Sequence, residues 1–302
     1  MEKPYYSLSE YLKGKFGERV YKISVNGGFT CPNRDGKKGV GGCIFCNEQG
    51  SGEHTLEGDI TRQMEDGIAF AKAKNKGNKY IAYFQNFTST YAPVNILRQK
   101  YAAALVNEKV VGLAVATRPD CIDEDVVKVI KEVANNRLAW VELGLQTANE
   151  NTAKIINRQY SNAEFTAAVK LLNEYNIPVV VHLIVGLPNE NFSDILNTVK
   201  FLNDHKIDGI KIHSLFVLKN TPLEKLYLGG KYTPIDRDFY IKCVAEILAR
   251  IPKNVVVHRL TGDGDKLQIL APQWTMEKKK NLNAVYSYMV KNNLTQGCNC
   301  TK

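Results

Sequence analysis

Short β-rich segments alternate with longer helical segments along most of the chain. The β-rich segments are dominated by Val, Ile and Tyr and are bounded by Gly, Pro or Asn, as strands usually are. They span residues 21–25, 79–84, 111–117, 140–145, 178–185, 209–215 and 255–258. Helical patterns span residues 59–76, 94–106, 123–133, 163–175, 193–203, 236–249 and 276–291. This regular alternation predicts an α/β protein with a parallel sheet.

The number of strand–helix units narrows the fold class. Six such units fall short of the eight that close a full barrel. The sequence therefore predicts a partial (β/α)6 TIM-like barrel, open on one side, with a short C-terminal extension. The expected boundary is the loop 218–234, which contains Gly229 and Gly230. We predict a barrel core over residues 1–217 and an extension over residues 218–302 that is too short to be a second catalytic domain.

Composition excludes several classes of protein. The chain has 302 residues, of which 44% are hydrophobic and 24% charged, values that are ordinary for a globular protein and not for a disordered or fibrous one. No apolar run approaches the roughly 20 residues of a membrane helix, and the first residues lack the apolar stretch of a secretory signal. We expect a cytoplasmic protein with no membrane partner.

The chain is basic. Lys and Arg number 40 against 31 Asp and Glu, so the formal net charge is +9. This excess favours an anionic partner, of which nucleic acid is the commonest, although a solvated basic surface gives the same count. Lys278, Lys279 and Lys280 open the last helix and form either a phosphate-binding patch or a solvated face.

Three of the seven cysteines cluster in a Gly-rich loop after the first strand. Cys31, Cys43 and Cys46 have the spacing C-x11-C-x2-C, and barrel active sites form in loops at this end of the strands. Three thiolates can hold a four-iron cluster with one iron left open. Zinc held by the same cysteines and His54 is an alternative, as are three ordinary buried cysteines. Cys298 and Cys300 resemble no usual cluster motif.

The chain resembles radical S-adenosylmethionine (radical SAM) proteins, specifically the YhcC-like group related to the catalytic subunit of Elongator. The resemblance covers nearly the whole chain. It rests on the motifs CPNRDGKKGVGGCIFC, YFQNFTSTYA, ATRPDCI, VELGLQT, HLIVGLP, GIKIHSLFVLKNTPL and HRLTGDGD. The cysteine spacing departs from the commonest radical SAM pattern, C-x3-C-x2-C, but matches this group. The expected fold is accordingly a partial barrel of radical SAM type.

The resemblance implies a [4Fe-4S] cluster on Cys31, Cys43 and Cys46 and S-adenosylmethionine bound at the open iron. Reduction by a donor such as flavodoxin or ferredoxin would then yield a 5′-deoxyadenosyl radical that removes a hydrogen atom from substrate. The predicted cofactor-binding residues are Gln85, Asn86, Glu142, Gln146, Arg158 and His182. The predicted substrate-facing residues are Lys211, His213 and Asp263.

The chemistry of these residues supports their predicted roles, and it leaves purely structural roles open as alternatives. Glu142 and Gln146 share one face of a strand because they are four apart, and Lys211 and His213 share one because they are two apart. The Arg158 guanidinium fork suits a carboxylate, yet Arg158 can also be a surface residue. His182 can equally be a satisfied core histidine, and Gln85-Asn86 and Asp263-Gly264 can be plain turns.

The favoured substrate is tRNA, because of the net charge and of the kinship with Elongator, which acts on the wobble uridine. The reaction we expect converts a carboxymethylaminomethyl-type group at C5 of that uridine toward an aminomethyl-type group. One alternative is a radical SAM enzyme acting on a small molecule or protein. The other is a non-catalytic, zinc-stabilised nucleic-acid-binding module.

Overall fold

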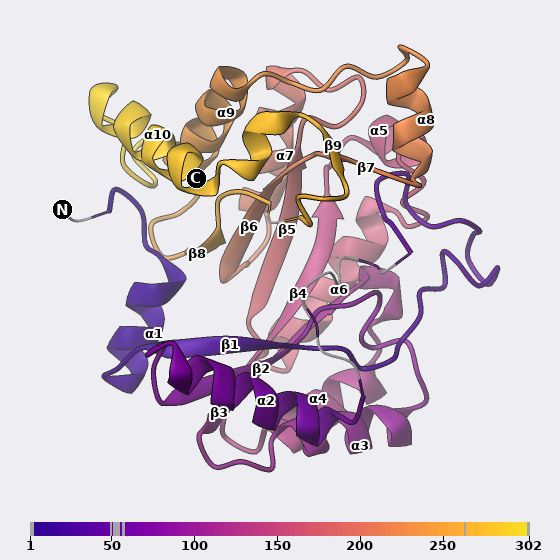
Figure 1. The fold of residues 1–302 in the computed structure, drawn as a ribbon, viewed down its shortest axis with the longest axis vertical. Helices are drawn as coiled ribbons and strands as arrows, with labels where there is room; N and C mark the ends of the chain where they lie inside the picture. Colours follow the sequence, from indigo (N-terminus) through magenta and orange to yellow (C-terminus); the bar gives the residue numbers. More distant parts are fainter. Residues whose placement is uncertain (1–2, 49, 51–54, 56–57, 263, 301–302) are drawn as a thin grey trace.

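The strands form one curled sheet and a short hairpin. The computed structural model describes residues 3–48, 50, 55, 58–262 and 264–300. The main sheet has seven parallel strands in the order β1-β2-β3-β4-β5-β6-β8 (Figure 1). These strands are β1 (Val20–Val25), β2 (Lys79–Phe84), β3 (Val110–Thr117), β4 (Leu138–Gln146), β5 (Val179–Val185), β6 (Gly209–Ser214) and β8 (Val256–Arg259). The hairpin pairs β7 (Val217–Leu218) with β9 (Ile269–Ala271).

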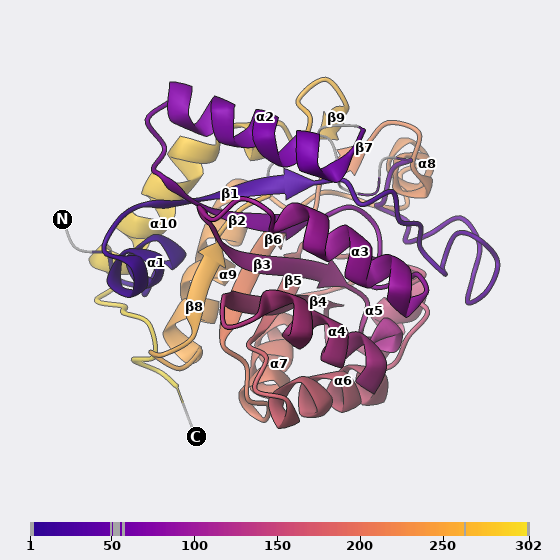
Figure 2. The same cartoon turned by 90° about the horizontal axis from the view of Figure 1, so that it is seen from below.

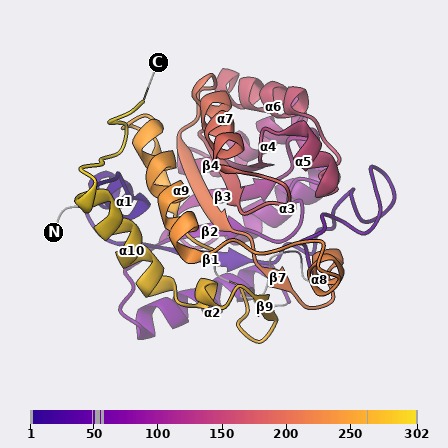
Figure 3. The same cartoon turned by 90° about the horizontal axis from the view of Figure 1, so that it is seen from above.

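Helices cover the convex face of the sheet, as Figure 2 shows from below and Figure 3 from above. The α-helices are α1 (Leu8–Phe16), α2 (Ile60–Ala73), α3 (Val94–Ala104), α4 (Glu124–Ala134), α5 (Glu150–Ile155), α6 (Asn162–Glu174), α7 (Phe192–Asn203), α8 (Pro222–Leu228), α9 (Arg237–Arg250) and α10 (Lys278–Lys291). Single 3-10 turns lie at Pro119–Cys121 and Gln273–Met276. The partial-barrel fold class predicted from the sequence is thereby confirmed.

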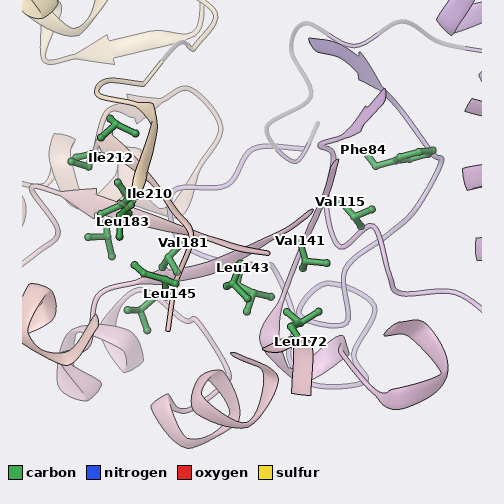
Figure 4. Packing of buried hydrophobic residues seen from close by; sticks show 14 of the residues in the cluster. Phe84, Val115, Val141, Leu143, Leu145, Leu172, Val181, Leu183, Ile210 and Ile212 are labelled. Carbon is green, nitrogen blue, oxygen red and sulfur yellow. The ribbon is translucent and has the colours of Figure 1, made fainter. Parts of the chain in front are cut away.

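The two faces of each strand are chemically different. On β4, Val141, Leu143 and Leu145 point into the large core between sheet and helices (Figure 4). The alternate residues of β4 face the concave side, the lumen, because successive side chains of a strand point to opposite faces. Burial of the convex set drives folding, since each fully buried aliphatic side chain contributes about 1.5–3 kcal/mol. The lumen is therefore free to carry polar groups.

The bottom of the lumen is closed by apolar side chains. A separate cluster there includes Leu12 of α1, Ile81, Trp140 and Val180. Helix α1 contacts both β1 and β8, the two edge strands, and Val257 N donates to Tyr6 O at 2.8 Å. Helix α1 thus closes the gap between the sheet edges at this end, and the upper lumen stays open.

The C-terminal segment completes the sheet. Strand β8 pairs with β6 as the seventh parallel strand, and α10 packs on α9. The division at residues 217 and 218 stays a prediction, and residues on both sides of it belong to one sheet. In the described part of the chain, no helix is both long and apolar enough to cross a membrane.

Candidate active site

The three clustered cysteines lie at the mouth of the lumen. Cys31, Cys43 and Cys46 all line one cavity that also reaches the polar side chains of the strands below. Cys46 N donates to Cys43 O at 3.0 Å, so a tight turn joins these two cysteines. The cavity opens at the carboxyl ends of the parallel strands, where α/β barrels place their reacting groups.

The loop owes its position to the first of the two residues between its last two cysteines. Ile44 is buried in a small second core with Ile156, Leu215 and Leu223. Its main chain bridges two helices, since Ile44 N donates to Ile156 O at 3.1 Å and Ile44 O accepts from Leu223 N at 2.9 Å. Helices α5 and α8, which the sequence patterns did not predict, therefore anchor the cysteine loop.

Side-chain amides fix the rest of the loop. Asn33 Nδ2 donates to Asn157 O at 2.6 Å, and Asn157 Nδ2 donates to Gly42 O at 2.7 Å. The Arg34 guanidinium donates to Cys46 O at 3.0 Å and contacts Asn47 O. These contacts tie both halves of the loop to the segment after α5, which holds the cysteines in place before any ligand binds.

The thiols fit an iron–sulfur cluster. Burial raises the pKa of Cys43 to about 12, with the charges of Cys46 and Cys31 adding to the shift. Thiolates this crowded need a cation to stabilise them, as a ligating metal does. Among the described residues, no three His, Cys, Asp or Glu side chains converge on a single-ion site, whereas a cluster accepts its thiolates at separate corners. His54 lies outside the described residues.

Three polar side chains line the same cavity or lie beside it, near the cysteines. Gln85 follows β2 and Gln146 ends β4. A bulge between Gly144 and Gln146 and a positive φ of 66° set the direction of Gln146. Asn86 is buried next to Gln85 in the chain, and its Nδ2 donates to Thr55 Oγ1 at 3.1 Å. The positions of Gln85, Asn86 and Gln146 at the cavity are thus compatible with their predicted role in binding the cofactor.

Arg118 is a cavity residue that the sequence analysis did not select. It lies after β3 in the motif ATRPDCI and pairs with Asp120 through two contacts of 2.9 Å. Two further donors reach Arg158 O at 3.0 Å and Gln159 O at 3.2 Å, which leaves one Nη1 hydrogen of Arg118 for a bound group. The sequence feature that could have identified Arg118 is an arginine directly after a buried strand.

Arg158 does not lie in the cavity. It is fully buried, and its guanidinium nitrogens all have protein acceptors. These acceptors are Tyr160 O, Leu145 O, Thr147 O, Glu150 Oε2 and Asn162 Oδ1. In this arrangement no Arg158 donor is left for a cofactor carboxylate, so the structure gives Arg158 the task of tying β4 to the segment before α6.

Replacing Arg158 by methionine is expected to destabilise the fold. The change leaves buried carbonyls without donors, which costs at least about 3 kcal/mol at 1–3 kcal/mol for each group. Urea unfolding measures this, with the exposed Lys154→Met on α5 as a control expected within about 0.5 kcal/mol of wild type. A stable Arg158→Met protein with weakened S-adenosylmethionine binding would instead support a direct cofactor contact.

Glu142 is the centre of a buried polar network in the lumen. Its Oε1 accepts from Trp140 Nε1 at 2.8 Å and lies 3.8 Å from Lys22 Nζ. Its Oε2 lies 2.8 Å from His182 Nε2 and also contacts Lys211 Nζ. Burial alone would raise the pKa of Glu142, but Lys211, Lys22 and His182 outweigh burial and hold it well below its usual value. Both oxygens are occupied, which disfavours the predicted cofactor contact.

The predicted substrate-facing residues on β6 do share one face. Lys211 and His213 both line the cavity, and Lys211 Nζ donates to Tyr83 Oη at 2.8 Å. The His213 ring lies 5.3 Å from the His182 ring, between centroids. Asp263 lies outside the described residues.

Acid is expected to destabilise the protein through its lumen histidines. Burial lowers the pKa of His182 from 6.5 to about 4, and it lowers the pKa of His213 and His258 well below 6.5. The unfolded chain therefore binds more protons below the unfolded pKa. Stability is fully present above about pH 6.5 and is lost as pH falls toward the folded values, by up to about 1.4 kcal/mol per pH unit for each histidine.

Urea unfolding between pH 7 and 4.5 tests this expectation. His258 packs edge-on against Trp140, with ring centroids 5.4 Å apart, so His258→Phe keeps an aromatic ring there. This variant is expected to lose stability less steeply with acid than wild type. A wild-type stability that stays flat across this range would contradict the assignment of neutral, buried histidines.

A parallel half-barrel whose mouth carries three thiols and whose lumen is polar is an α/β fold that offers ligands for a metal cofactor at its open end. The profile described as Radical SAM superfamily matches residues 29–202, and the profile described as Radical_SAM C-terminal domain matches residues 207–291. The chain belongs to the radical SAM superfamily. The resemblance inferred from the motifs is confirmed, and so are its cofactors, a [4Fe-4S] cluster and S-adenosylmethionine, as cofactors of the family.

Individual relatives place the chain within the superfamily. It is 42% identical over 286 residues to YtqA of Bacillus subtilis (strain 168), covering 94% of this chain and 89% of the relative. It is 36% identical over 265 residues to YhcC of Escherichia coli (strain K12), covering 87% and 85%. Membership of the radical SAM superfamily favours an enzyme over the alternative of a non-catalytic zinc module.

More distant matches include a tRNA uridine(34) acetyltransferase and an archaeal Elp3. A tRNA uridine(34) acetyltransferase of Dehalococcoides mccartyi (strain CBDB1) is 29% identical over 168 residues, covering 53% of this chain and 36% of that protein. The solved archaeal Elp3 of Methanocaldococcus infernus has a TM-score of 0.70 at 19% identity, covering 92% of this chain and 64% of that chain. The structure of the archaeal Elp3 supports the assignment of the fold of this chain.

Proposed function

We propose that this radical SAM enzyme modifies the C5 side chain of the wobble uridine of tRNA. Cys31, Cys43 and Cys46 would hold the cluster at the lumen mouth. The bound cluster and S-adenosylmethionine supply a 5′-deoxyadenosyl radical when an external donor, such as a flavodoxin or ferredoxin, delivers an electron. Gln85 and Gln146 would orient the cofactor, and the lumen would exclude water from the radical. The reaction would take a carboxymethylaminomethyl-type group toward an aminomethyl-type group.

The observation that carries this proposal is the position of the lumen below the cysteine loop, in a chain that matches a tRNA uridine(34) acetyltransferase. A wobble base is unpaired in its loop, so extruding it costs less than opening a duplex. Exposed Lys219, Lys225 and Lys231 lie on and around α8, which contacts the cysteine loop. These lysines would hold the phosphates around the extruded base.

Salt-dependent binding of tRNA tests the proposal. Affinity is expected to fall steeply with salt, and Lys219→Gln with Lys225→Gln is expected to lower the log–log slope by about 0.7–0.9 for each phosphate that is no longer neutralised. The matched control is Lys13→Gln with Lys15→Gln on α1, at the closed end of the lumen. Lys278, Lys279 and Lys280 can be tested in the same way. Binding that is absent, or insensitive to salt, would contradict a tRNA substrate.

A further inference from the structure

The lumen of this protein carries more positively than negatively charged side chains, of which Lys211 and Glu142 are fully buried. Among the described residues around the network, Lys22, Lys211 and Arg259 are cations, while Glu142 is the one carboxylate that faces them. Glu142 already contacts both lysines, His182 and Trp140. It therefore has no oxygen left for Arg259. An enclosed site with this imbalance favours an incoming anion, because unpaired buried charge is expensive.

A bulge directs Arg259 into the lumen. Val257 of β8 pairs with Ile210, but Lys211 pairs with Arg259, so His258 is the extra residue. Bulges of this kind re-aim side chains next to active sites. Here the bulge lets two consecutive residues face inward, His258 against Trp140 and Arg259 into the cavity. A regular strand would have turned Arg259 to the convex face, where it would be buried among apolar side chains.

His213 supplies a second unsatisfied group at the same place. Its Nε2 is buried and has no hydrogen-bond partner among the described residues. His213 lies two residues after Lys211 on β6, and both side chains line the cavity with Arg259. Burial lowers the pKa of Lys211, and the charges of Lys22 and Arg259 add to this shift. An anion between these side chains would oppose the repulsion and give His213 a partner.

We propose that Arg259 and His213, beside the Lys211–Glu142 pair, bind a carboxylate of the substrate. The inference rests on the proposed function only for the identity of the molecule that bears this carboxylate. In a carboxymethylaminomethyl group, the carboxylate is the terminal group. Its capture would hold the neighbouring CH2 groups in the upper lumen, below the cysteine loop, where the radical forms. Arg259 and His213 are substrate-binding residues in this account.

The carboxylate of S-adenosylmethionine is the competing occupant. The cofactor must lie against the cysteine loop, and the cavity arginine near the carboxyl end of β3 is Arg118. Strand β3 lies four strands from β8 in the sheet order, so Arg118 and Arg259 lie on different walls of the half-barrel. This separation favours one carboxylate site for each of the two molecules.

Titration with N-benzylglycine tests the inference without RNA. This probe joins an aromatic ring through CH2–NH–CH2 to a carboxylate, and benzylamine is its counterpart without the carboxymethyl group. The reconstituted protein with S-adenosylmethionine is expected to bind N-benzylglycine about ten- to a hundredfold more tightly than benzylamine, the range for a charge-assisted contact. Arg259→Gln is expected to remove this difference, and Lys266→Gln, an exposed charge change nearby, is expected to keep it.

Three results would overturn the inference. The first is equal binding of N-benzylglycine and benzylamine by wild type. The second is an undiminished preference for N-benzylglycine in Arg259→Gln. The third is a loss of S-adenosylmethionine affinity in that variant that is as large as its loss of N-benzylglycine affinity. Arg259→Lys, which keeps the charge without the fork, guards against misfolding and is expected to keep part of the preference. Anticodon stem-loops carrying the carboxymethylaminomethyl or the aminomethyl group then test the substrate. Failure to bind either RNA, with N-benzylglycine still preferred, would contradict the tRNA assignment alone.

Discussion

Replacing Cys43 by alanine is expected to remove nearly all iron from the anaerobically reconstituted protein. Wild type is expected to be brown and to carry about four irons and four sulfides per chain. Cys43 lies at the tight turn to Cys46, and burial raises the pKa of its thiol to about 12. A cluster with two remaining thiolates would be lost, and cleavage of S-adenosylmethionine to 5′-deoxyadenosine would fall to background.

Two control variants sharpen this test. Cys298→Ala changes an exposed cysteine of the tail and is expected to keep the full iron content. His54→Ala is expected to keep it as well, whereas a zinc site built on the three cysteines and His54 would lose metal in both Cys43→Ala and His54→Ala. Stoichiometric zinc with negligible iron in wild type would contradict the proposed assignment of the cluster to this loop.

Replacing Glu142 by glutamine is expected to destabilise the protein by about 3–5 kcal/mol, the cost of removing one partner from a buried ion pair. Lys211 is 1% exposed and Lys22 is also in contact with Glu142, so both amines would lose their carboxylate. Urea unfolding at pH 7 measures the loss. Because its pKa in the folded protein is held well below its usual value, the contribution of Glu142 is fully present above about pH 4.5 and is lost progressively as pH falls below that value.

A double variant separates the ion pair from simple packing damage. Glu142→Leu with Lys211→Met removes both charges and keeps similar volume, and it is expected to recover most of the lost stability. The two residues are in contact, so the two changes should not be additive. A double variant as unstable as the sum of its parts, or a Glu142→Gln loss below about 1 kcal/mol, would contradict the central role of Glu142 in the network.

Much of the architecture followed from the sequence because it depends on local patterns. The strand segments were apolar runs bounded by turn residues, and the structure has a strand at each of them. The helix predicted over residues 163–175 is present as α6, and Ser161 Oγ accepts from Glu164 N at 3.2 Å at its start. Helices α1, α5 and α8 were missed because they are short, and their stability comes from contacts with distant segments. Such contacts leave no periodic signal within the helix itself.

The residues of the functional site could be predicted only where they lie together in one segment of the sequence. The cysteine spacing and the shared face of Lys211 and His213 are local features. The pairing of Lys22 with Glu142 is not, since the two residues lie on strands that are far apart in the chain. Arg158 was misplaced because its sequence neighbours say nothing about the carbonyls at the end of β4 that occupy its donors. Arg259 faces the lumen because of a one-residue bulge, which pattern analysis does not reveal.

The most direct test of the account is the nucleoside content of tRNA from a strain that lacks this protein. Total tRNA is digested and its wobble nucleosides are measured by mass spectrometry, with plasmid-borne wild type and Cys43→Ala for complementation. The account predicts that the carboxymethylaminomethyl-type uridine accumulates, that wild type restores its conversion, and that Cys43→Ala does not. An unchanged set of tRNA nucleosides in the deletion strain would contradict the proposed substrate and reaction.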